Sequence, residues 1–317
     1  MAETDDFLIS SDAETVLLQT VQASVDQTQL VDPAILEVLE EGEKVLGVFE
    51  HGVSIWAETF RIGCKTDQGE CHSYFLKTLS TPNAAGRVHG EYRSMKALHE
   101  TLPTAVPTPR GYGACRDQPG IYFYLCDYIE ATQSLPDQVR LGLKLAELHH
   151  RSNSPNGMFG FYCPTYDGDQ IMNTTWDSNW TTFFKRRIYE AYVLDVERNG
   201  HWKLYEDVVQ SNIGTEEATG EIYFWDPCAY YAHHEREVAI WRCAHHQMTD
   251  EKYREQYFKN YPPSEPREEA DDGNRLYSVE ILMNHGLSHE GSKTRQLAVQ
   301  ELQFLIAKYF SDDQAGD

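Results

Sequence analysis

A change in hydrophobic period partway along the chain sets the main limit on its fold. Residues 43–79, "EKVLGVFEHGVSIWAETFRIGCKTDQGECHSYFLKTL", form short β-rich runs separated by Gly52, Gly63 and the triplet "DQG". This pattern is typical of an antiparallel meander of three strands. Farther along the chain, most apolar residues recur at helical spacing instead. The sequence therefore predicts an α+β fold with two lobes, an N-terminal lobe with an antiparallel sheet of up to five strands and a mainly helical C-terminal lobe.

The same patterns predict the elements and the domain boundaries. Residues 103–113 are rich in proline and predict a turn, whereas residues 152–176 are too rich in Gly, Pro, Asn and aromatic residues for a helix or a strand and predict a long loop. We expect helices over 89–102, 140–152, 179–197, 234–246 and 294–310, and a further strand over 121–131. The expected domains are an acidic lead over 1–30, an N-lobe over 31–130 and a helical C-lobe over 131–317.

Charge and composition exclude several classes of partner. The chain has 317 residues, 41% of them hydrophobic, which is enough for a large core. Its 27 Lys and Arg residues against 50 Asp and Glu residues give a formal net charge of −23, and such a field repels nucleic acid and anionic membrane surfaces. The first residues carry acids where a signal peptide needs basic residues, and no apolar run has the length of a membrane-spanning helix. We expect a soluble cytoplasmic protein with no nucleic-acid or membrane partner.

Lys77 is unusual because it interrupts an apolar strand. The run "SYFLKTL" is apolar on both sides of the lysine, and a lysine inside a sheet needs a partner. The phosphates of a nucleotide would supply one. The helix that follows carries Glu91 near its start, where an acid either pairs with Lys77 or stabilises the helix through its dipole.

The order of the polar groups along the chain is that of a phosphotransfer site. A glycine turn, a strand lysine and a helix glutamate are followed by a connecting strand, the spacing Asp-x4-Asn and a strand-terminal aspartate. Phosphoryl transfer needs a cation on the nucleotide phosphates, a base near the acceptor hydroxyl and oxygen ligands for Mg²⁺. Asp207 is the candidate base, and Asn212 and Asp226 are the candidate metal ligands. The candidate nucleotide-binding residues are Gly52, Val53, Ser54, Lys77, Glu91, Asp127 and Tyr128.

Several stretches of the sequence resemble the fructosamine/ketosamine-3-kinase family. They are "EHGVSIW", "SYFLK", "VHGEYRSMKALH", "LAELHHRSNSPNGMFGF", "TTWDSNWTTFF", "SNIGT" and "EIYFWDPCAYYAHHEREVAIW". The resemblance implies the protein kinase-like fold of aminoglycoside phosphotransferases, with ATP and Mg²⁺ as cofactors. It also implies phosphorylation of the O3 of ketosamines, ribulosamine or fructosamine, on glycated proteins or small amines. Since the 3-phosphate is unstable and leaves the amine, the reaction would be a deglycation repair step.

One segment departs from the pattern of that family. The family's catalytic loop reads His-Gly-Asp, followed by a stretch with Trp and then by Asn, whereas here "DVERNGHWKLYEDVVQ" runs directly into "SNIGT". The resemblance therefore implies a deletion near residues 208–211, as a skipped exon or an incorrect gene model would produce. Asp207 is then either a substitute base or a solvent-facing acid of the preceding helix. In the second case the chain is an inactive family member that binds nucleotide or a glycated partner without turnover.

The acceptor site and two rival functions complete the expectations. The sugar is expected against "SPNGMFGF" and "TTWDSNW", where Phe159, Phe161 and Trp176 either pack on its apolar face or belong to the core. The run "HHE" at 233–235 suggests a zinc hydrolase, but the position that requires the second His of His-Glu-x-x-His holds Val238. The sequence thus favours histidines that cap and line a helix. A small-molecule amine or aminoglycoside kinase of the same fold is the third alternative.

Overall fold

The structure is a computed structural model that describes residues 31–53, 57–132, 134–199, 213–216, 222–224, 229–289 and 292–310. The chain divides into two compact units. The first comprises Met1–His89 and Pro109–Ile129, and the second comprises Gly90–Thr108 and Glu130–Asp317.

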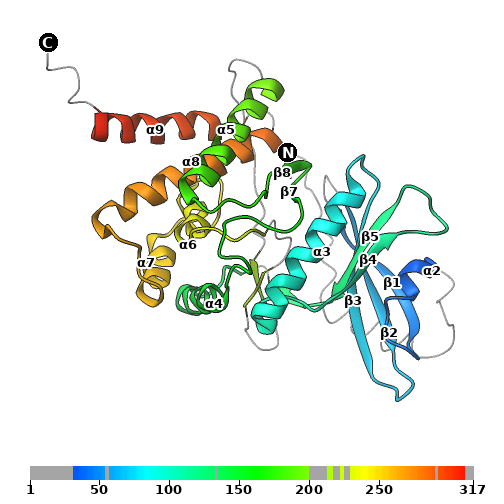
Figure 1. Cartoon of the computed structure of the whole chain (residues 1–317). Helices are drawn as coiled ribbons and strands as arrows, with labels where there is room; N and C mark the ends of the chain where they lie inside the picture. Colours follow the sequence, from blue (N-terminus) through cyan, green and yellow to red (C-terminus); the bar gives the residue numbers. More distant parts are fainter. Residues whose placement is uncertain are drawn as a thin grey trace, which may run out of the picture. The chain divides into compact units, whose positions relative to one another are not determined.

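A five-stranded antiparallel sheet forms the frame of the first unit (Figure 1). Its strands are β1 (Lys44–Val53), β2 (Glu58–Lys65), β3 (Cys71–Leu79), β4 (Pro109–Ala114) and β5 (Tyr122–Asp127), in the order β1-β2-β3-β5-β4. The predicted meander and the strand after it are confirmed. The expected proline-rich turn is wrong in part, because residues 109–114 form β4. Pro109 is tolerated there because it is the first residue of an edge strand.

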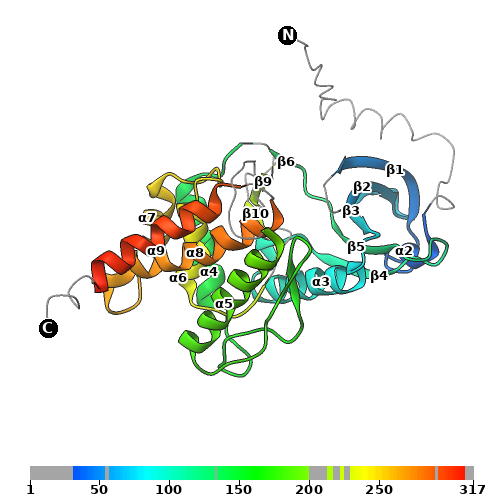
Figure 2. The same ribbon diagram turned by 90° about the horizontal axis from the view of Figure 1, so that it is seen from above.

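One face of this sheet carries the core of the first unit. Successive strand residues point to opposite faces, and the short helix α2 (Pro33–Leu36) lies beside the sheet in both views (Figures 1 and 2). Asp32 caps α2 by accepting a hydrogen bond from the Ala34 N–H at 2.9 Å. The core contains the buried side chains of Ile35, Val45, Ile62, Tyr74, Leu76, Phe123 and Leu125.

Helix α3 (Ala84–Thr101) starts five residues before the predicted helix. Val88 and Met95 are fully buried on it. Its first turns belong to the first unit and its remainder to the second. It is therefore the helix by which the chain first passes from one unit into the other.

The second unit is mainly helical, as predicted. Its α-helices in the described ranges are α4 (Gln138–Arg151), α5 (Trp180–Asn199), α6 (His234–Glu237), α7 (Glu251–Asn260), α8 (Ala270–Ser288) and α9 (Thr294–Phe310). Helix α8 packs against α5 and α9, and α4 packs against α7 (Figures 1 and 2). No helix of the described ranges is both long enough and apolar enough to cross a membrane.

Two small sheets accompany these helices. One consists of β6 (Ala131–Thr132), β9 (Ile213–Glu216) and β10 (Ile222–Phe224), and the other of β7 (Thr165–Asp167) and β8 (Gln170–Met172). The β7–β8 hairpin lies inside the predicted long loop, so the expectation of no regular element there is wrong. Gly168 explains the hairpin, because its φ of +60° suits the tight turn between the paired residues Asp167 and Gln170.

The helix predicted over 234–246 is shorter than expected. It ends after one turn as α6, and the chain continues as a 3-10 helix, η4 (Val238–Arg242). Val238 and Trp241 of η4 are both buried. Residues three apart share a face in a 3-10 helix and also in an α-helix, so the apolar spacing does not distinguish the two.

Candidate functional site

Strand pairing places Gly52 and Lys77 in one row across the sheet of the first unit. Gly52 of β1 pairs with Thr59 of β2, and Thr59 pairs with Lys77 of β3. Because neighbouring strands lie about 4.8 Å apart, the Gly52 and Lys77 backbones are about 10 Å apart. Backbone N–H groups at the glycine and the ammonium group of the lysine can hold one polyphosphate over such a distance.

A β-bulge lies at the glycine end of this row. The β1–β2 register shifts between Glu50 and Gly52, and a bulge of this kind bends the strand and redirects side chains. The His51 ring meets the rings of Phe75 and Tyr128 edge-on, at centroid distances of 5.9 and 5.0 Å. Ser54 lies outside the described residues, so the predicted phosphate cradle is described only as far as Val53.

Lys77 is half-buried in the central strand of the sheet, as predicted. It lies between Thr59 on β2 and the buried Tyr124 on β5. Tyr74 and Leu76 of the same strand belong to the core, so the lysine points to the opposite face. This position keeps the ammonium group out of the apolar core.

Asp127 and Tyr128, at the end of β5, both contact arginines of the first unit. The Asp127 carboxylate accepts a hydrogen bond from Arg110 Nε at 2.5 Å. The guanidinium of Arg61 lies over the Tyr128 ring, 4.3 Å from its centroid. Since the Asp127 carboxylate is engaged in an ion pair, a nucleotide contact at this residue would come from its backbone.

The remaining candidates for catalysis are described only in part. Glu91 lies on α3, in the second unit, and its pairing with Lys77 stays a prediction. Asp207, Asn212 and Asp226 lie outside the described residues, so the base and the metal ligands also stay predictions. Strand β9 begins at the residue after Asn212, strand β10 ends two residues before Asp226, and these two strands pair antiparallel. The strand-like run predicted before Asp226 is confirmed by β10.

The segment that contains two of the predicted acceptor aromatics is held by backbone hydrogen bonds on both sides. Phe159 N–H donates to the Asp177 carbonyl at 2.8 Å, and Phe161 N–H donates to the Thr174 carbonyl at 2.9 Å. On the other side, Gly160 and Tyr231 exchange two hydrogen bonds, of 3.0 and 2.8 Å. The segment therefore lies between the Trp176 region and the segment that follows Asp226.

The predicted aromatic residues lie together in the second unit. The Trp176 ring stacks on Tyr231 at a centroid distance of 6.0 Å, and Phe161 lies 6.3 Å from Tyr231. Phe159 lies 5.3 Å from Trp180. Phe161 is only 4% exposed and serves the core, whereas Phe159 and Trp176 are half-buried. Sequence reasoning missed Tyr231 and Trp180, although Tyr231 lies just five residues after Asp226.

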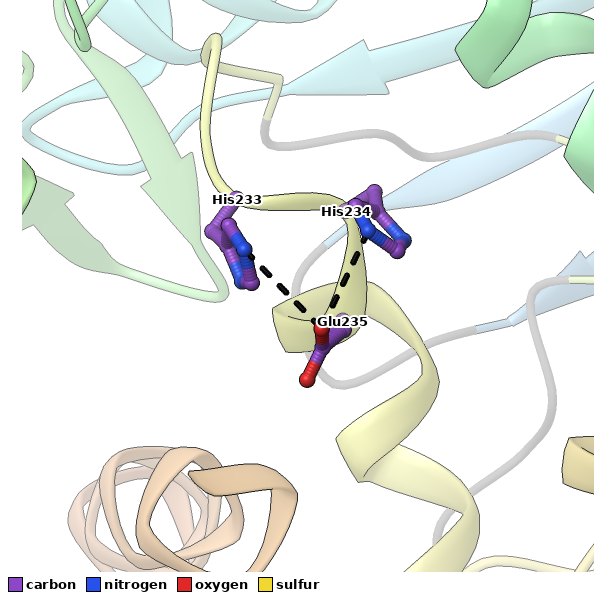
Figure 3. Close-up of side chains that lie close together, drawn as sticks. All are labelled: His233, His234 and Glu235. Atoms are coloured by element: carbon purple, nitrogen blue, oxygen red, sulfur yellow. Dashed lines mark ion pairs between the residues drawn. The ribbon is translucent and has the colours of Figure 1, made fainter. Parts of the chain in front are cut away.

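His233, His234 and Glu235 form a compact polar group (Figure 3). The Nε2 atoms of the two histidines lie 4.0 and 3.9 Å from Glu235 Oε1. Ser264 closes the group, because its Oγ lies 2.8 Å from His233 Nε2 and 3.3 Å from His234 Nε2. Its N–H also donates to Glu235 Oε1 at 2.7 Å. Both imidazoles therefore share one hydroxyl.

The contacts of His233 extend to helices α5 and α8. Trp180 Nε1 can only donate, and it donates to Tyr277 Oη at 3.0 Å. The Tyr277 hydroxyl also lies 3.2 Å from His233 Nδ1. Tyr277 thus links the Trp180 indole to the histidine pair.

The same chain of hydrogen bonds continues to helix α4. Ser264 Oγ contacts His234 Nε2, His234 Nδ1 lies 3.0 Å from Tyr257 Oη, and Tyr257 Oη lies 2.8 Å from His149 Nδ1. Burial and a neighbouring imidazole lower the pKa of His234 to about 4 and that of His149 to about 3. A neutral imidazole has one donor nitrogen and one acceptor nitrogen, which suits this chain of hydrogen bonds. Because both Nε2 atoms of the histidine pair have protein partners, the arrangement favours the predicted structural role over a metal site.

A buried ion network holds the segment that follows Asp226. Glu280 of α8 lies 2.6 Å from Arg187 of α5 and 3.1 Å from Arg236 of α6, measured between oxygen and nitrogen. Burial alone would raise the pKa of Glu280, but the two guanidinium groups lower it below its usual value. Both guanidinium groups also lie over the Tyr230 ring, at 4.5 and 5.2 Å. The network thus fixes Tyr230 to three helices.

Comparison with known sequences links the chain to one family. The family model described as fructosamine kinase matches residues 58–215. The chloroplastic protein-ribulosamine 3-kinase of Oryza sativa subsp. indica is 28% identical over 289 residues, which cover 80% of this chain and 78% of the relative. The corresponding protein of Arabidopsis thaliana is 28% identical over 247 residues, which cover 70% of this chain and 72% of the relative.

Comparison with solved structures establishes the fold. Proposed fructosamine-3-kinases from Haemophilus somnus 129PT and Thermobifida fusca YX-ER1 align with TM-scores of 0.63, at 17% and 19% identity, over 86% of this chain and 96% and 98% of those chains. A thermostable mutant of the aminoglycoside phosphotransferase APH(4)-Ia, in a ternary complex with AMP-PNP and hygromycin B, aligns with a TM-score of 0.52 at 15% identity, over 90% of this chain and 99% of that chain. The predicted kinase-like fold is confirmed. By its sequence matches, the chain belongs to the fructosamine kinase family.

Proposed function

We propose that the chain is an ATP-dependent ketosamine kinase that phosphorylates the O3 of ribulosamine or fructosamine on glycated proteins or small amines. The observation that carries this proposal is the family match over residues 58–215, which includes Lys77 and Asn212. Two relatives are named for ribulosamine phosphorylation. The product would release its amine, so the reaction would serve deglycation repair.

The geometry of the first unit fits a nucleotide. Lys77 lies in the central strand, on the face away from the core and in one row with Gly52. In this role its ammonium group binds the phosphates, and the backbone N–H groups from Gly52 to Ser54 cover them. Glu91 would orient the lysine. ATP also fits the fold, since the aligned aminoglycoside phosphotransferase holds AMP-PNP.

The transfer step would use residues of the second unit. Asp207 would accept the proton of the sugar O3 hydroxyl, while Asn212 and Asp226 would hold Mg²⁺, which neutralises charge on the phosphates when bound. Phe159, half-buried beside Trp180, and Trp176, half-buried beside Tyr231, would pack on the sugar. The cytoplasmic location stays a prediction, and the plant relatives are named chloroplastic.

A transfer assay tests this proposal. The 317-residue chain and its Asp207→Asn variant are incubated with labelled ATP, Mg²⁺ and a ribulosylated lysine peptide. We expect transfer by the chain and none by the variant. If the folded chain binds Mg-ATP but transfers no phosphate, the alternative of an inactive family member replaces the kinase.

A further inference from the structure

An open groove of about 680 Å³ lies in the second unit, between the β7–β8 hairpin and helix α5. Nine of the residues around it are apolar, aromatic or cysteine, and the others are one Asn, two Thr and one Glu. Its walls include Phe161 and Tyr162 before β7, Ile171 and Met172 on β8, and Tyr189 and Val193 on α5. Such a volume and lining are typical of a ligand site.

The groove exposes apolar groups that a protein surface usually hides. Gln170 and Met172 of β8 are buried, while Ile171 between them is 54% exposed. The strand therefore turns an apolar side chain to solvent, where the alternation normally gives a polar one. The rings of Tyr189 and Tyr162 are 67% and 43% exposed. Several such residues in one depression indicate a binding surface.

The charge of the groove favours a cationic occupant. Glu190 is the one charged residue among the described residues that line it, and its Oε1 accepts a hydrogen bond from Asn173 Nδ2 at 2.7 Å. This bond holds the carboxylate in the wall beside Tyr189. The face of a tyrosine ring and a carboxylate both attract an ammonium or guanidinium group. The formal charge of −23 strengthens the attraction at long range.

The groove is joined to the segment that follows Asp226. Gly160, next to Phe161 of the groove wall, exchanges two backbone hydrogen bonds with Tyr231. Tyr231 is the fifth residue after Asp226, and five residues span at most about 18 Å. This link between the groove wall and the segment after Asp226 is the basis for placing at the groove the residues that flank a modified lysine.

We propose that this groove binds the polypeptide that flanks a glycated lysine, with a Lys or Arg side chain of that polypeptide against Tyr189 and Glu190. The inference rests on the proposed function and extends it. The two residues would contact the flanking chain and not the sugar. They would therefore determine how well a glycated polypeptide competes with a free ketosamine.

The first experiment measures binding without catalysis. A fluorescein-labelled, unglycated lysine-rich peptide and a peptide of equal length with serine for lysine are titrated with the 317-residue chain, and anisotropy is followed. We expect the lysine-rich peptide to bind more tightly, and Tyr189→Ala and Glu190→Gln each to weaken its binding about fivefold to tenfold. Tyr192→Ala and Glu197→Gln are the matched controls, because both residues are exposed on α5 outside the groove. Equal binding of the serine peptide, or equal losses in the controls, would overturn the proposal.

The second experiment separates the groove from the proposed function. It measures kcat/KM for a ribulosylated lysine-rich peptide, divided by kcat/KM for ribulosyl-lysine as a free amino acid. We expect this ratio to fall about fivefold in the two groove variants and to stay constant in the two controls. A constant ratio in the groove variants contradicts the proposal that the groove binds the flanking polypeptide. If the chain phosphorylates neither substrate, the kinase function fails. The anisotropy titration alone then tests whether the groove binds the polypeptide.

Discussion

Packing alone does not require a charged side chain at Lys77. The residue before it, Leu76, belongs to the core, and the lysine follows on the opposite face in the row that begins at Gly52. A Met at this position would fill nearly the same space without the charge. A substitution of Lys77 by Met therefore tests whether nucleotide binding depends on the charge.

We predict that Lys77→Met weakens the binding of a fluorescent ATP analogue at least tenfold, because the phosphates lose their cation. The variant should still fold, since the thioether fits an apolar strand. Lys65→Met at the end of β2 is the matched control, since Lys65 pairs with Cys71 far along the sheet from Lys77. Equal affinities of the two variants in a fluorescence titration would remove Lys77 from the nucleotide site.

Much of the residue-level expectation required only local sequence. The strand position of Lys77 could be predicted because a charge inside an apolar run is visible in the sequence alone, whereas its nucleotide role and the acceptor role of Phe159 and Trp176 stay predictions. The ion pair between Asp127 and Arg110 could not be found in this way. It depends on the pairing of β4 with β5, and the sequence had suggested a turn in place of β4. Tyr231 was missed because its contacts join segments far apart in the chain.

At the scale of elements, the segment around Gly160 shows how tightly the acceptor region is built. Gly160 has φ +137°, and a Cβ atom added there would lie 2.7 Å from the Thr174 carbonyl oxygen and 3.0 Å from the Trp176 Cα. Both contacts are with backbone, which cannot move aside as a flexible side chain can. Gly157 in the same loop has φ +70°, but an added Cβ would meet nothing within 4 Å.

We therefore predict different costs for two glycine substitutions in one loop. Gly160→Ala should lower the free energy of unfolding by about 2–4 kcal/mol, because backbone must shift. Gly157→Ala should lower it by about 1 kcal/mol, the cost of a positive φ alone. Urea denaturation of both variants measures the difference. Equal losses would mean that the pairing of Gly160 with its neighbours is not tight.

The buried network on α8 gives a second prediction at this scale. Removing the charge of Glu280 leaves Arg187 and Arg236 buried without their shared carboxylate, so Glu280→Gln should cost about 3 kcal/mol of unfolding free energy. Glu251→Gln is the comparison, because Glu251 is 80% exposed and pairs with Arg254 at 3.4 Å. Its loss should cost less than about 1 kcal/mol. If chemical denaturation finds similar values for both, the network contributes no more than a surface pair.

Helices with a long regular period were the elements that sequence predicted best. Helix α9 begins and ends where its pattern does, and α5 differs from its prediction by one residue at the start and two at the end. The helix predicted over 234–246 was not observed in full, because the i, i+3 spacing of Val238 and Trp241 suits an α-helix and a 3-10 helix equally and periodicity alone does not separate them. The β7–β8 hairpin carried a usable signal, the Gly-Asp turn at residues 168–169, but aromatic and proline content suggested a loop.

At the scale of the whole molecule, the histidine chain connects stability to pH. It joins α4, α6 and α7 and continues to α8 through Tyr277. His234 and His149 have pKa values of about 4 and about 3 in the fold, whereas an unfolded histidine titrates near about 6.5. Between these values the unfolded chain binds more protons than the folded one, so stability is complete above about pH 6.5 and falls as the pH is lowered.

We predict that the unfolding free energy decreases between pH 7 and pH 5 by up to about 1.4 kcal/mol per pH unit for each of these two histidines. Urea denaturation at several pH values measures the slope. His234→Gln should reduce the slope by the share of that one histidine, because the glutamine binds no proton in either state. His150→Gln, at an exposed position on α4, should retain most of the slope. An equal slope in all three proteins would show that other groups cause the dependence.

The strand pairing that sets Gly52 opposite Thr59, and Thr59 opposite Lys77, has a consequence for the register of β3. A slip of β3 by one residue would exchange its two faces and turn Lys77 into the core that holds Tyr74 and Leu76. Burying an ammonium group there would cost several kcal/mol, a large part of the roughly 5–15 kcal/mol that stabilises a typical fold. The charge of Lys77 therefore disfavours a one-residue slip of β3, whatever the residue binds in the folded protein.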